Sequence, residues 1–144
     1  MPPQTRTMNY WLVKSEPFKY SWEQFQKDRK TFWDGVRNYE ARNNLRDMKL
    51  GDKVLFYHSN EGLEIVGVAS VVGEAYPDPT SDDKQWLVVD LKPLKNLKRT
   101  LPLAEIKADE VLSQMQMIKR NRLSVTRVSA DEYHRVMAIT GTRP

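Results

Sequence analysis

The side chains best suited to bind a ligand lie together between residues 32 and 43. Within five positions the chain places a large aromatic, a carboxylate, a glycine and a cation, namely Trp33, Asp34, Gly35 and Arg37. The Asp-Gly pair predicts a tight turn, because glycine tolerates positive φ and allows a close backbone approach. Asn38 then has the chemistry of a helix N-cap. These features predict a ligand pocket with free N–H groups, and a turn whose tryptophan fills the core is the alternative.

Residues for nucleophilic or metal chemistry are few. The 144 residues contain no cysteine and two histidines, His58 and His134, and neither has a second histidine at metal-ligand spacing. No glycine-rich phosphate loop and no nucleophile-elbow motif is present in the sequence. We therefore expect no metal and no cofactor. Acid–base catalysis at Glu16, Asp34 or His58 stays open as an alternative.

The composition favours a single domain with a polyanionic partner. A chain of 144 residues has the length of one domain with a real core. Its formal net charge of +4 favours nucleic acid as the partner. No apolar run approaches the ~20 residues that span a bilayer, so no membrane partner is expected. The absence of cysteine fits a reducing cytosol, and we expect a monomeric, cytoplasmic protein.

Apolar patterns and turn signals predict the elements that must position these side chains. The predicted strands cover residues 10–14, 53–59, 63–74, 86–91 (with a possible extension to Leu97) and 124–128. The predicted helices cover residues 22–27, 39–47, about 102–106, about 109–115 and 130–138. Residues 75–83, rich in proline and acids, predict a surface loop. About five strands with short helices between them predict an α+β fold built on a small, strongly bent sheet or barrel.

Local patterns also predict how these elements begin and pair. Ser21 with Gln24, and Ser129 with Glu132, predict capping boxes at two helix starts. The third predicted strand is expected to pair antiparallel with the strand before it. Gly67 within that strand indicates a bulge or a close approach by another group.

Periodicity assigns side chains to faces. Ala41, Leu45 and Met48 share one face of the second predicted helix, whereas Arg42 and Arg46 form a cationic stripe on another. In the strand over residues 53–59, even-numbered and odd-numbered side chains point to opposite faces.

Aromatic residues interleave with polar and basic residues along the chain. Most of them must fill the core of a domain of this size. One or two at a pocket would suit a planar base, because base–aromatic stacking is worth ~1–3 kcal/mol per base. Amides and hydroxyls such as those of Asn38 and Ser59 could bind the edge of the base, and arginines could bind phosphate.

Three ordered motifs resemble the signature of the EVE domain family. They are YWLVKSEP at residues 10–17, WDGVRNYxARN at residues 33–43 and GDxVxFYHSN at residues 51–60. Further matching stretches lie at residues 65–67, 74–80 and 121–125. The resemblance covers residues 8–139. We expect the domain to span residues 8–140, between a disordered tail at 1–7 and a C-terminal tail at 141–144.

The resemblance implies a PUA-like fold. This is a bent β-barrel of about five to six mostly antiparallel strands surrounded by short helices, and it is related to the YTH domain that reads methylated adenine in RNA. The resemblance also implies a non-catalytic module that binds DNA or RNA and recognises a modified base flipped into an aromatic pocket.

The related YTH pattern implies which residues form that pocket. A Lys-Ser pair after the first strand and a tryptophan after the first helix line it, and Lys14, Ser15 and Trp33 occupy the matching places. The expected base-pocket residues are Lys14, Ser15, Trp33, Asp34, Gly35, Asn38, Tyr57, His58, Ser59 and Asn60. The expected phosphate contacts are Arg37, Arg42, Arg46 and Arg122.

Two other functions stay open at this point. An enzyme acting on modified nucleic acid would use Glu16, Asp34 or His58 and would turn over an oligonucleotide. A protein-interaction module with a vestigial pocket would show no dependence on the base, and its Trp33 would be buried beneath other side chains.

Overall fold

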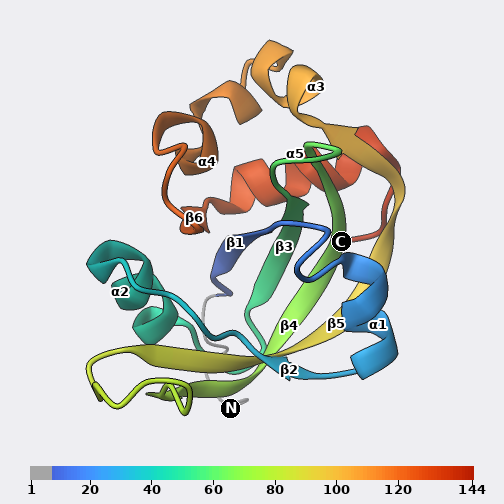
Figure 1. Cartoon of the computed structure of the whole chain (residues 1–144). Coiled ribbons are helices and arrows are strands. Elements are labelled where there is room, and N and C mark those ends of the chain that lie inside the picture. Colours follow the sequence, from blue (N-terminus) through green and yellow to red (C-terminus); the bar gives the residue numbers. More distant parts are fainter. Residues whose placement is uncertain (1–7) are drawn as a thin grey trace, which may run out of the picture.

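In residues 8–144, which the computed structural model describes, six strands form one sheet in the order β2-β5-β4-β3-β1-β6 (Figure 1). The tail expected over residues 1–7 lies outside the described residues. The strands are β1 (Tyr10–Ser15), β2 (Thr31–Phe32), β3 (Lys53–His58), β4 (Glu64–Pro77), β5 (Leu87–Pro102) and β6 (Val125–Val128). Neighbouring strands pair antiparallel, including the predicted pair of β3 and β4, except that β1 and β3 are parallel.

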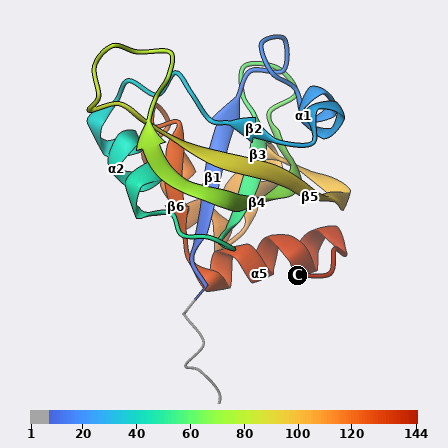
Figure 2. The ribbon, with the colours of Figure 1, turned by 90° about the horizontal axis from the view of Figure 1, so that it is seen from below.

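The mixed α+β class is confirmed. A barrel is not confirmed, because the sheet is not closed. The strand order ends at β2 on one side and β6 on the other. β2 has two residues and pairs with β5, and no ladder in the described residues joins β2 to β6. The register of β4 against β5 shifts at several places, and such bulges increase the local bend and twist. Figure 2 shows both strands curving across the sheet.

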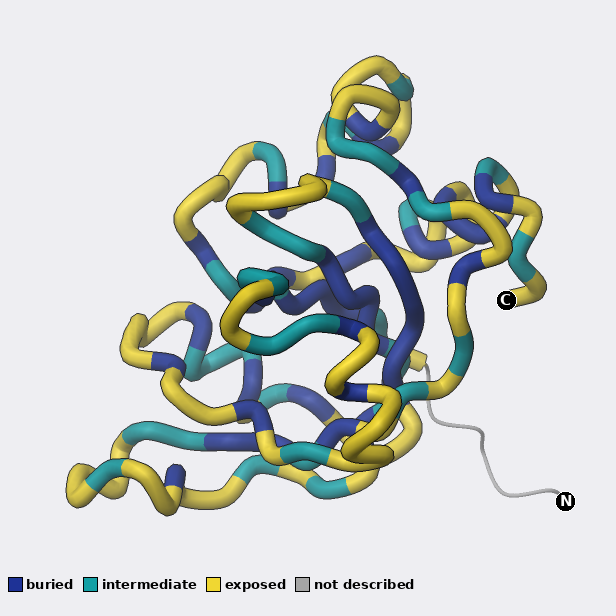
Figure 3. Tube along the Cα trace, turned by 45° about the vertical axis from the view of Figure 1, so that its right-hand side comes forward, coloured by how far each residue is buried: buried dark blue, intermediate teal, exposed yellow. Residues whose placement is uncertain are grey.

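The sheet has an apolar core on each face, because alternate strand residues point to opposite sides. Different helices cover the two faces. In β3, Val54 and Phe56 belong to one core, while Leu55 and Tyr57 belong to the other, as the alternation predicts. The first core is covered by α1 (Trp22–Asp28) and α2 (Tyr39–Asp47). The second is covered by α3 (Leu103–Ala108), the 3₁₀ turn η1 (Leu112–Gln114), α4 (Gln116–Lys119) and α5 (Ala130–Thr140). In Figure 3 the longest buried stretches run through the central strands.

Side-chain hydrogen bonds define where the helices begin. Asn38 caps α2 by accepting an N–H of its first turn at 3.0 Å, so this helix starts where the sequence predicts. Ser129 and Glu132 form the complete capping box predicted for α5. Ser21 caps α1 by accepting the Gln24 N–H. The capping box predicted at α1 is nevertheless incomplete, because the Gln24 side chain bonds the end of its own helix instead.

At Gly67 of β4, α1 approaches the sheet closely. The register between β3 and β4 shifts beside it, between Phe56 and Tyr57. A Cβ atom at residue 67 would lie 2.2 Å from Cζ2 of Trp22. Both the bulge and the close approach that the sequence predicts are therefore confirmed.

The loop predicted over residues 75–83 begins later than expected and spans residues 78–86. β4 continues to Pro77, and Asp78 is only 2% exposed. A buried carboxylate is tolerated when hydrogen bonds replace its water, and Asp78 accepts several. β5 also extends past the predicted limit of Leu97, and α4 was not predicted.

The helices of the described residues are short, and the longest has 11 residues. None of those between residues 8 and 144 has the length and apolar character needed to cross a membrane.

Candidate nucleic-acid interface

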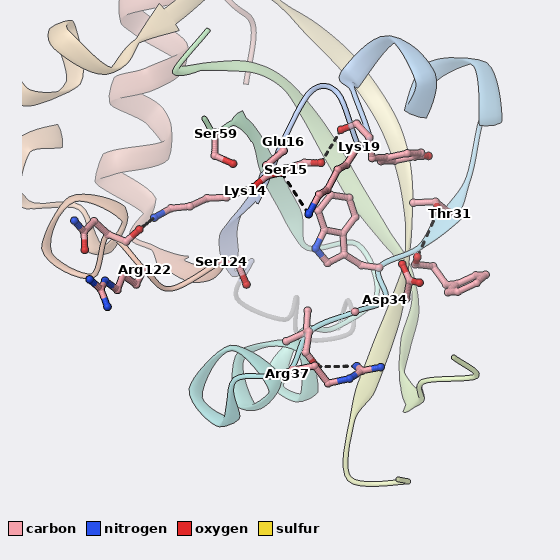
Figure 4. A pocket seen from close by; sticks show the side chains of 16 residues that line it. Lys14, Ser15, Glu16, Lys19, Thr31, Asp34, Arg37, Ser59, Arg122 and Ser124 are labelled. Carbon is pink, nitrogen blue, oxygen red and sulfur yellow. Dashed lines mark hydrogen bonds and ion pairs between the residues drawn. The ribbon is translucent and has the colours of Figure 1, made fainter. Parts of the chain in front are cut away.

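An open cavity of about 640 Å³ lies where the parallel strands β1 and β3 end together (Figure 4). Ser59, directly after β3, donates its N–H to the Ser15 carbonyl at 2.9 Å and closes this edge of the sheet. The other walls are the turn after β1, the loop between β2 and α2, and the turn before β6. The lining residues are Lys14, Ser15, Glu16, Lys19, Tyr20, residues 31–37, Ser59, Asn121, Arg122 and Ser124.

Trp33 forms an aromatic part of the cavity wall and is held rigidly by the core. The residue is 9% exposed and belongs to the first core, and its ring meets Phe56 edge-on at 5.6 Å and Tyr20 edge-on at 6.2 Å between ring centroids. The backbone N–H of Trp33 donates to the Val89 carbonyl at 2.8 Å. Such edge-to-face contacts fix the plane of a ring. The ring is therefore a fixed wall with a small accessible area, not a free-standing side chain.

Asp78 holds the loop that carries Trp33. Its Oδ2 accepts the Gly35 N–H at 3.1 Å and Nη1 of Arg37 at 2.9 Å. Its Oδ1 accepts the N–H and the hydroxyl of Thr80 at 2.7 and 2.6 Å. Gly35 has φ of +78°, so a side chain there would be strained.

The electrostatics of Asp78 follow from these contacts. Burial alone would raise the pKa of its carboxyl, but the hydrogen bonds from Thr80, Arg37 and Gly35 outweigh burial and lower this pKa to about 2. The sequence analysis missed Asp78 because it lies in a segment of prolines and acids. A signal was present, since an aspartate two residues before Thr80 can bond the backbone two residues on.

Lys14 and Ser15 support the walls of the cavity from within. The Lys14 Nζ donates to the carbonyls of Asn121 at 3.0 Å and Met117 at 3.3 Å, and burial lowers the pKa of this amine. The Ser15 hydroxyl donates to the Tyr20 carbonyl at 2.6 Å. With its proton committed in this way, the Ser15 oxygen can only accept a hydrogen bond from a ligand.

Arg122 is the cation that the fold leaves free at the rim. Its side chain is exposed, and within residues 8–144 it makes no hydrogen bond or ion pair. Lys19 instead pairs with Glu16 at 3.5 Å. In Figure 4, Lys14, Arg122 and Ser124 lie on one side of the cavity, and Thr31 and Asp34 lie on the other.

Eight of the residues expected from the sequence line this cavity. They are Lys14, Ser15, Trp33, Asp34, Gly35, Arg37, Ser59 and Arg122. The sequence analysis did not single out Lys19, Tyr20, Thr31, Phe32, Val36, Asn121 and Ser124, which also line it. Most of these residues carry polar groups that are common along the chain, and only the turns around the sheet bring them together.

Four expected base-pocket residues lie elsewhere. Asn38 caps α2 and lines a smaller neighbouring cavity. Tyr57 is 4% exposed and faces the opposite core. His58 accepts the backbone N–H of Trp22 at 3.1 Å through Nε2. Burial lowers the pKa of His58, although the nearby Glu64 acts to raise it. Asn60 has φ of +71° in the exposed turn after β3.

Three expected phosphate contacts already have partners. Arg37 bonds Asp78. Arg42 donates through Nη1 to the Gln85 carbonyl at 3.0 Å. Arg46 lies 3.6 Å from Asp47 on the exposed side of α2.

The acids named for a catalytic alternative are not gathered around a histidine. Glu16 and Asp34 line the cavity, whereas His58 does not. Between residues 8 and 144, no group of three His, Asp or Glu side chains is placed to hold a metal ion.

The chain is similar to several characterised sequences and structures. The family model described as EVE domain matches residues 9–139. Thymocyte nuclear protein 1 of Gallus gallus is 37% identical over 96% of this chain and 71% of its own length. A crystal structure of a protein from Agrobacterium tumefaciens is 44% identical with a TM-score of 0.90, over 93% of this chain and 94% of that one. The crystal structure of the human THYN1 protein in complex with DNA containing 5-methylcytosine is 36% identical with a TM-score of 0.86, over 94% and 99% of the two chains.

A more distant structure is similar in fold alone. The YTH domain of the Zygosaccharomyces rouxii MRB1 protein, in complex with N6-methyladenosine RNA, shares 12% identity and a TM-score of 0.58 over 97% of this chain and 93% of that one. This likeness fits the PUA-like fold expected from the motifs. The family model covers most of the residues, and the relatives exceed 30% identity over almost the full chain. The chain therefore belongs to the EVE domain family.

Proposed function

We propose that this protein is a non-catalytic module that binds DNA or RNA and receives a modified base, flipped out of its strand, in the cavity beside Trp33. The observation that carries the proposal is an open cavity with an aromatic wall and, at its rim, an arginine that has no partner within residues 8–144. The human THYN1 protein has been solved with DNA containing 5-methylcytosine, which supports the same class of ligand here.

The lining residues divide into three roles in this proposal. Trp33 contacts the plane of the base, because a flat ring suits stacking. Ser15 and Ser59 contact its edge, with Ser15 limited to accepting a hydrogen bond. Arg122 binds the phosphate, because its guanidinium is free and phosphate contacts position a strand.

Selectivity for a modification then requires more than the added methyl group. Burying one methyl contributes only about 1 kcal/mol. Strong discrimination therefore depends on hydrogen bonds at the base edge that a wrong base leaves unmade.

A monomeric state and a cytoplasmic location stay predictions from the sequence.

The proposal is tested by titrating the protein with matched oligonucleotides and following fluorescence anisotropy at one stated salt concentration. The set contains unmodified, 5-methylcytosine and N6-methyladenine strands, each as DNA and as RNA. We expect the wild type to prefer one modified strand. Trp33→Ala should weaken binding of that strand about 5- to 150-fold, from the loss of ~1–3 kcal/mol of stacking, and should remove the preference.

Controls separate recognition from folding and from catalysis. Circular dichroism checks that Trp33→Ala folds. Trp33→Phe keeps an aromatic wall and should retain the preference, and it serves as the test variant if Trp33→Ala does not fold. Recovered oligonucleotides should be chemically unchanged by mass spectrometry. Equal binding of all strands by the wild type would overturn the proposal, and turnover of a strand would establish the enzymatic alternative.

A further inference from the structure

An aromatic pair flanked by two arginines lies beside the cavity, and of its two rings Tyr39 is exposed and Trp86 is half-buried. Tyr39, the first residue of α2, is 58% exposed, and its ring centroid lies 5.0 Å from that of Trp86 with a 30° angle between planes. The Arg42 guanidinium lies 5.6 Å from the Tyr39 ring, and that of Arg37 lies 5.8 Å from the Trp86 ring. We call these four residues the aromatic ledge.

The fold does not need the Tyr39 ring to hold the segment that carries Trp86. The Asp78 N–H donates to the Trp86 carbonyl at 2.8 Å, and the Trp86 N–H donates to the Asp83 carbonyl at 3.3 Å. Arg42 ties the same segment to α2 through the Gln85 carbonyl. These bonds already fix the segment, so the exposed side chain of Tyr39 is available for another role.

The charges around the ledge favour an anionic partner. Arg42 uses Nε and Nη1 within the fold, and its Nη2 makes no hydrogen bond within residues 8–144. Three neighbouring carboxylates already have partners, because Asp78 binds Arg37, Glu40 binds Arg120 at 2.7 Å, and Asp83 accepts the Gln85 N–H at 3.1 Å. An aromatic face with a cation over it is the combination that binds single-stranded nucleic acid, through stacking and phosphate contact together.

The ledge is continuous with the cavity. Arg37 lines the cavity and also lies over the Trp86 ring. Tyr39 follows Arg37 by two residues, which span at most ~7 Å. Because the cavity wall and the ledge share Arg37 and Tyr39 follows within that distance, a nucleotide adjacent to one held in the cavity is placed to reach Tyr39.

We infer that the aromatic ledge binds the nucleotide next to the base held in the cavity, with its unpaired base against Tyr39 and its phosphate at Arg42. This inference rests on the proposed function, because the cavity must hold one nucleotide before the ledge can hold its neighbour. It also defines the ligand more narrowly. The strand must be unpaired for at least one nucleotide on one side of the modified base.

The inference is tested with a length series of probes. The first probe is the preferred modified nucleoside, and the others add one, two or three thymidines on its 5′ side or its 3′ side. Binding of each is measured by NMR chemical-shift titration. The wild type should gain about tenfold in affinity when the first nucleotide is added on one of the two sides, in the range of base–aromatic stacking. Tyr39→Ala should lose this gain and bind the nucleoside as the wild type does.

Matched variants keep the result interpretable. Tyr39→Phe retains the ring and should retain the gain. Tyr76→Ala removes another exposed tyrosine, 37% exposed, that does not line the cavity, and it should behave as the wild type. If Tyr39→Ala keeps the full gain, or weakens nucleoside and longer probes equally, the inference is overturned while the proposed function stands. If the wild type shows no preference for a modified base, the proposed function fails, and a gain that still depends on Tyr39 would support the ledge as a general nucleotide site.

Discussion

The carboxylate of Asp78 joins two distant segments at the wall of the cavity. Its oxygens accept hydrogen bonds from Gly35 and Arg37, more than 40 residues earlier, and from Thr80 beside it. A charged group with 2% exposure is stable only because each oxygen is bonded. The loop that carries Trp33 thus depends on an acid that touches no ligand.

We predict that Asp78→Asn destabilises the protein at pH 7 by about 2 kcal/mol, since the pKa of Asp78 is lowered to about 2 from an ordinary value of 3.8. Because the pKa of Asp78 is lower in the folded state than in the unfolded state, its carboxylate stabilises the fold at pH values above the unfolded-state pKa. This stability is lost as the pH falls towards the folded-state pKa. The difference between wild type and variant should therefore shrink between about pH 4 and pH 2. Urea unfolding across this range checks it, with exposed Asp82→Asn as the control. Parallel curves for wild type and Asp78→Asn would contradict the prediction.

At the scale of elements, α1 and β4 meet closely at Gly67. Trp22 of α1 lies over Gly67 of β4 and donates its indole N–H to Asn96 of β5 at 2.5 Å. The ring also packs edge-on against Phe56 at 5.2 Å. Because backbone and ring are in contact there, the position has no room for a side chain.

Gly67→Ala is expected to reduce the free energy of unfolding by about 1–3 kcal/mol, because the new methyl group would displace the Trp22 ring. Urea unfolding followed by tryptophan fluorescence measures the loss. Val72→Ala, at a 40% exposed site on the same strand, should change stability by less than about 0.5 kcal/mol. A similarly small effect of Gly67→Ala would mean that α1 can shift away from the sheet at little cost.

At the scale of the whole molecule, the net charge of +4 matters through the cations that remain available around the cavity. Arg122 has no partner within residues 8–144, Lys19 has only an exposed pair with Glu16, and Arg42 has a free Nη2. Exposed ion pairs contribute little, so Lys19 can exchange its partner for a phosphate.

We predict that three phosphate contacts give a slope of about −2 for log affinity against log salt on a single strand, so a fourfold rise in salt weakens binding about 20-fold. Arg122→Gln should make that slope shallower by about 0.7. Lys107→Gln, on an exposed position of α3 beside the other core, should leave it unchanged. A wild-type slope near zero would show that these cations do not contact phosphate.

Much of the architecture follows from local sequence signals. Asn38 alone places the start of α2, because its side chain satisfies a helix N–H within four residues. The alternation along β3 correctly divides its residues between two cores, since strand side chains alternate by geometry. The ordered motifs identify the family because they combine several such local constraints in one order.

The residues that form the site are harder to predict from the sequence, because the site depends on contacts between residues that are distant in the chain. Strand alternation already implies that four consecutive residues from Tyr57 to Asn60 cannot all face one cavity. The structure shows Ser59 alone of them in the lining.

By itself, the sequence determined the α+β class, the family and the starts of α1, α2 and α5, because each depends on residues close together in the chain. Only the tertiary structure decided that the sheet stays open, that Asp78 holds the Trp33 loop and that Tyr39 meets Trp86. The physical reason is that hydrogen bonds and ring contacts act over a few ångströms. Which residues come within that range is settled by the packing of the whole chain.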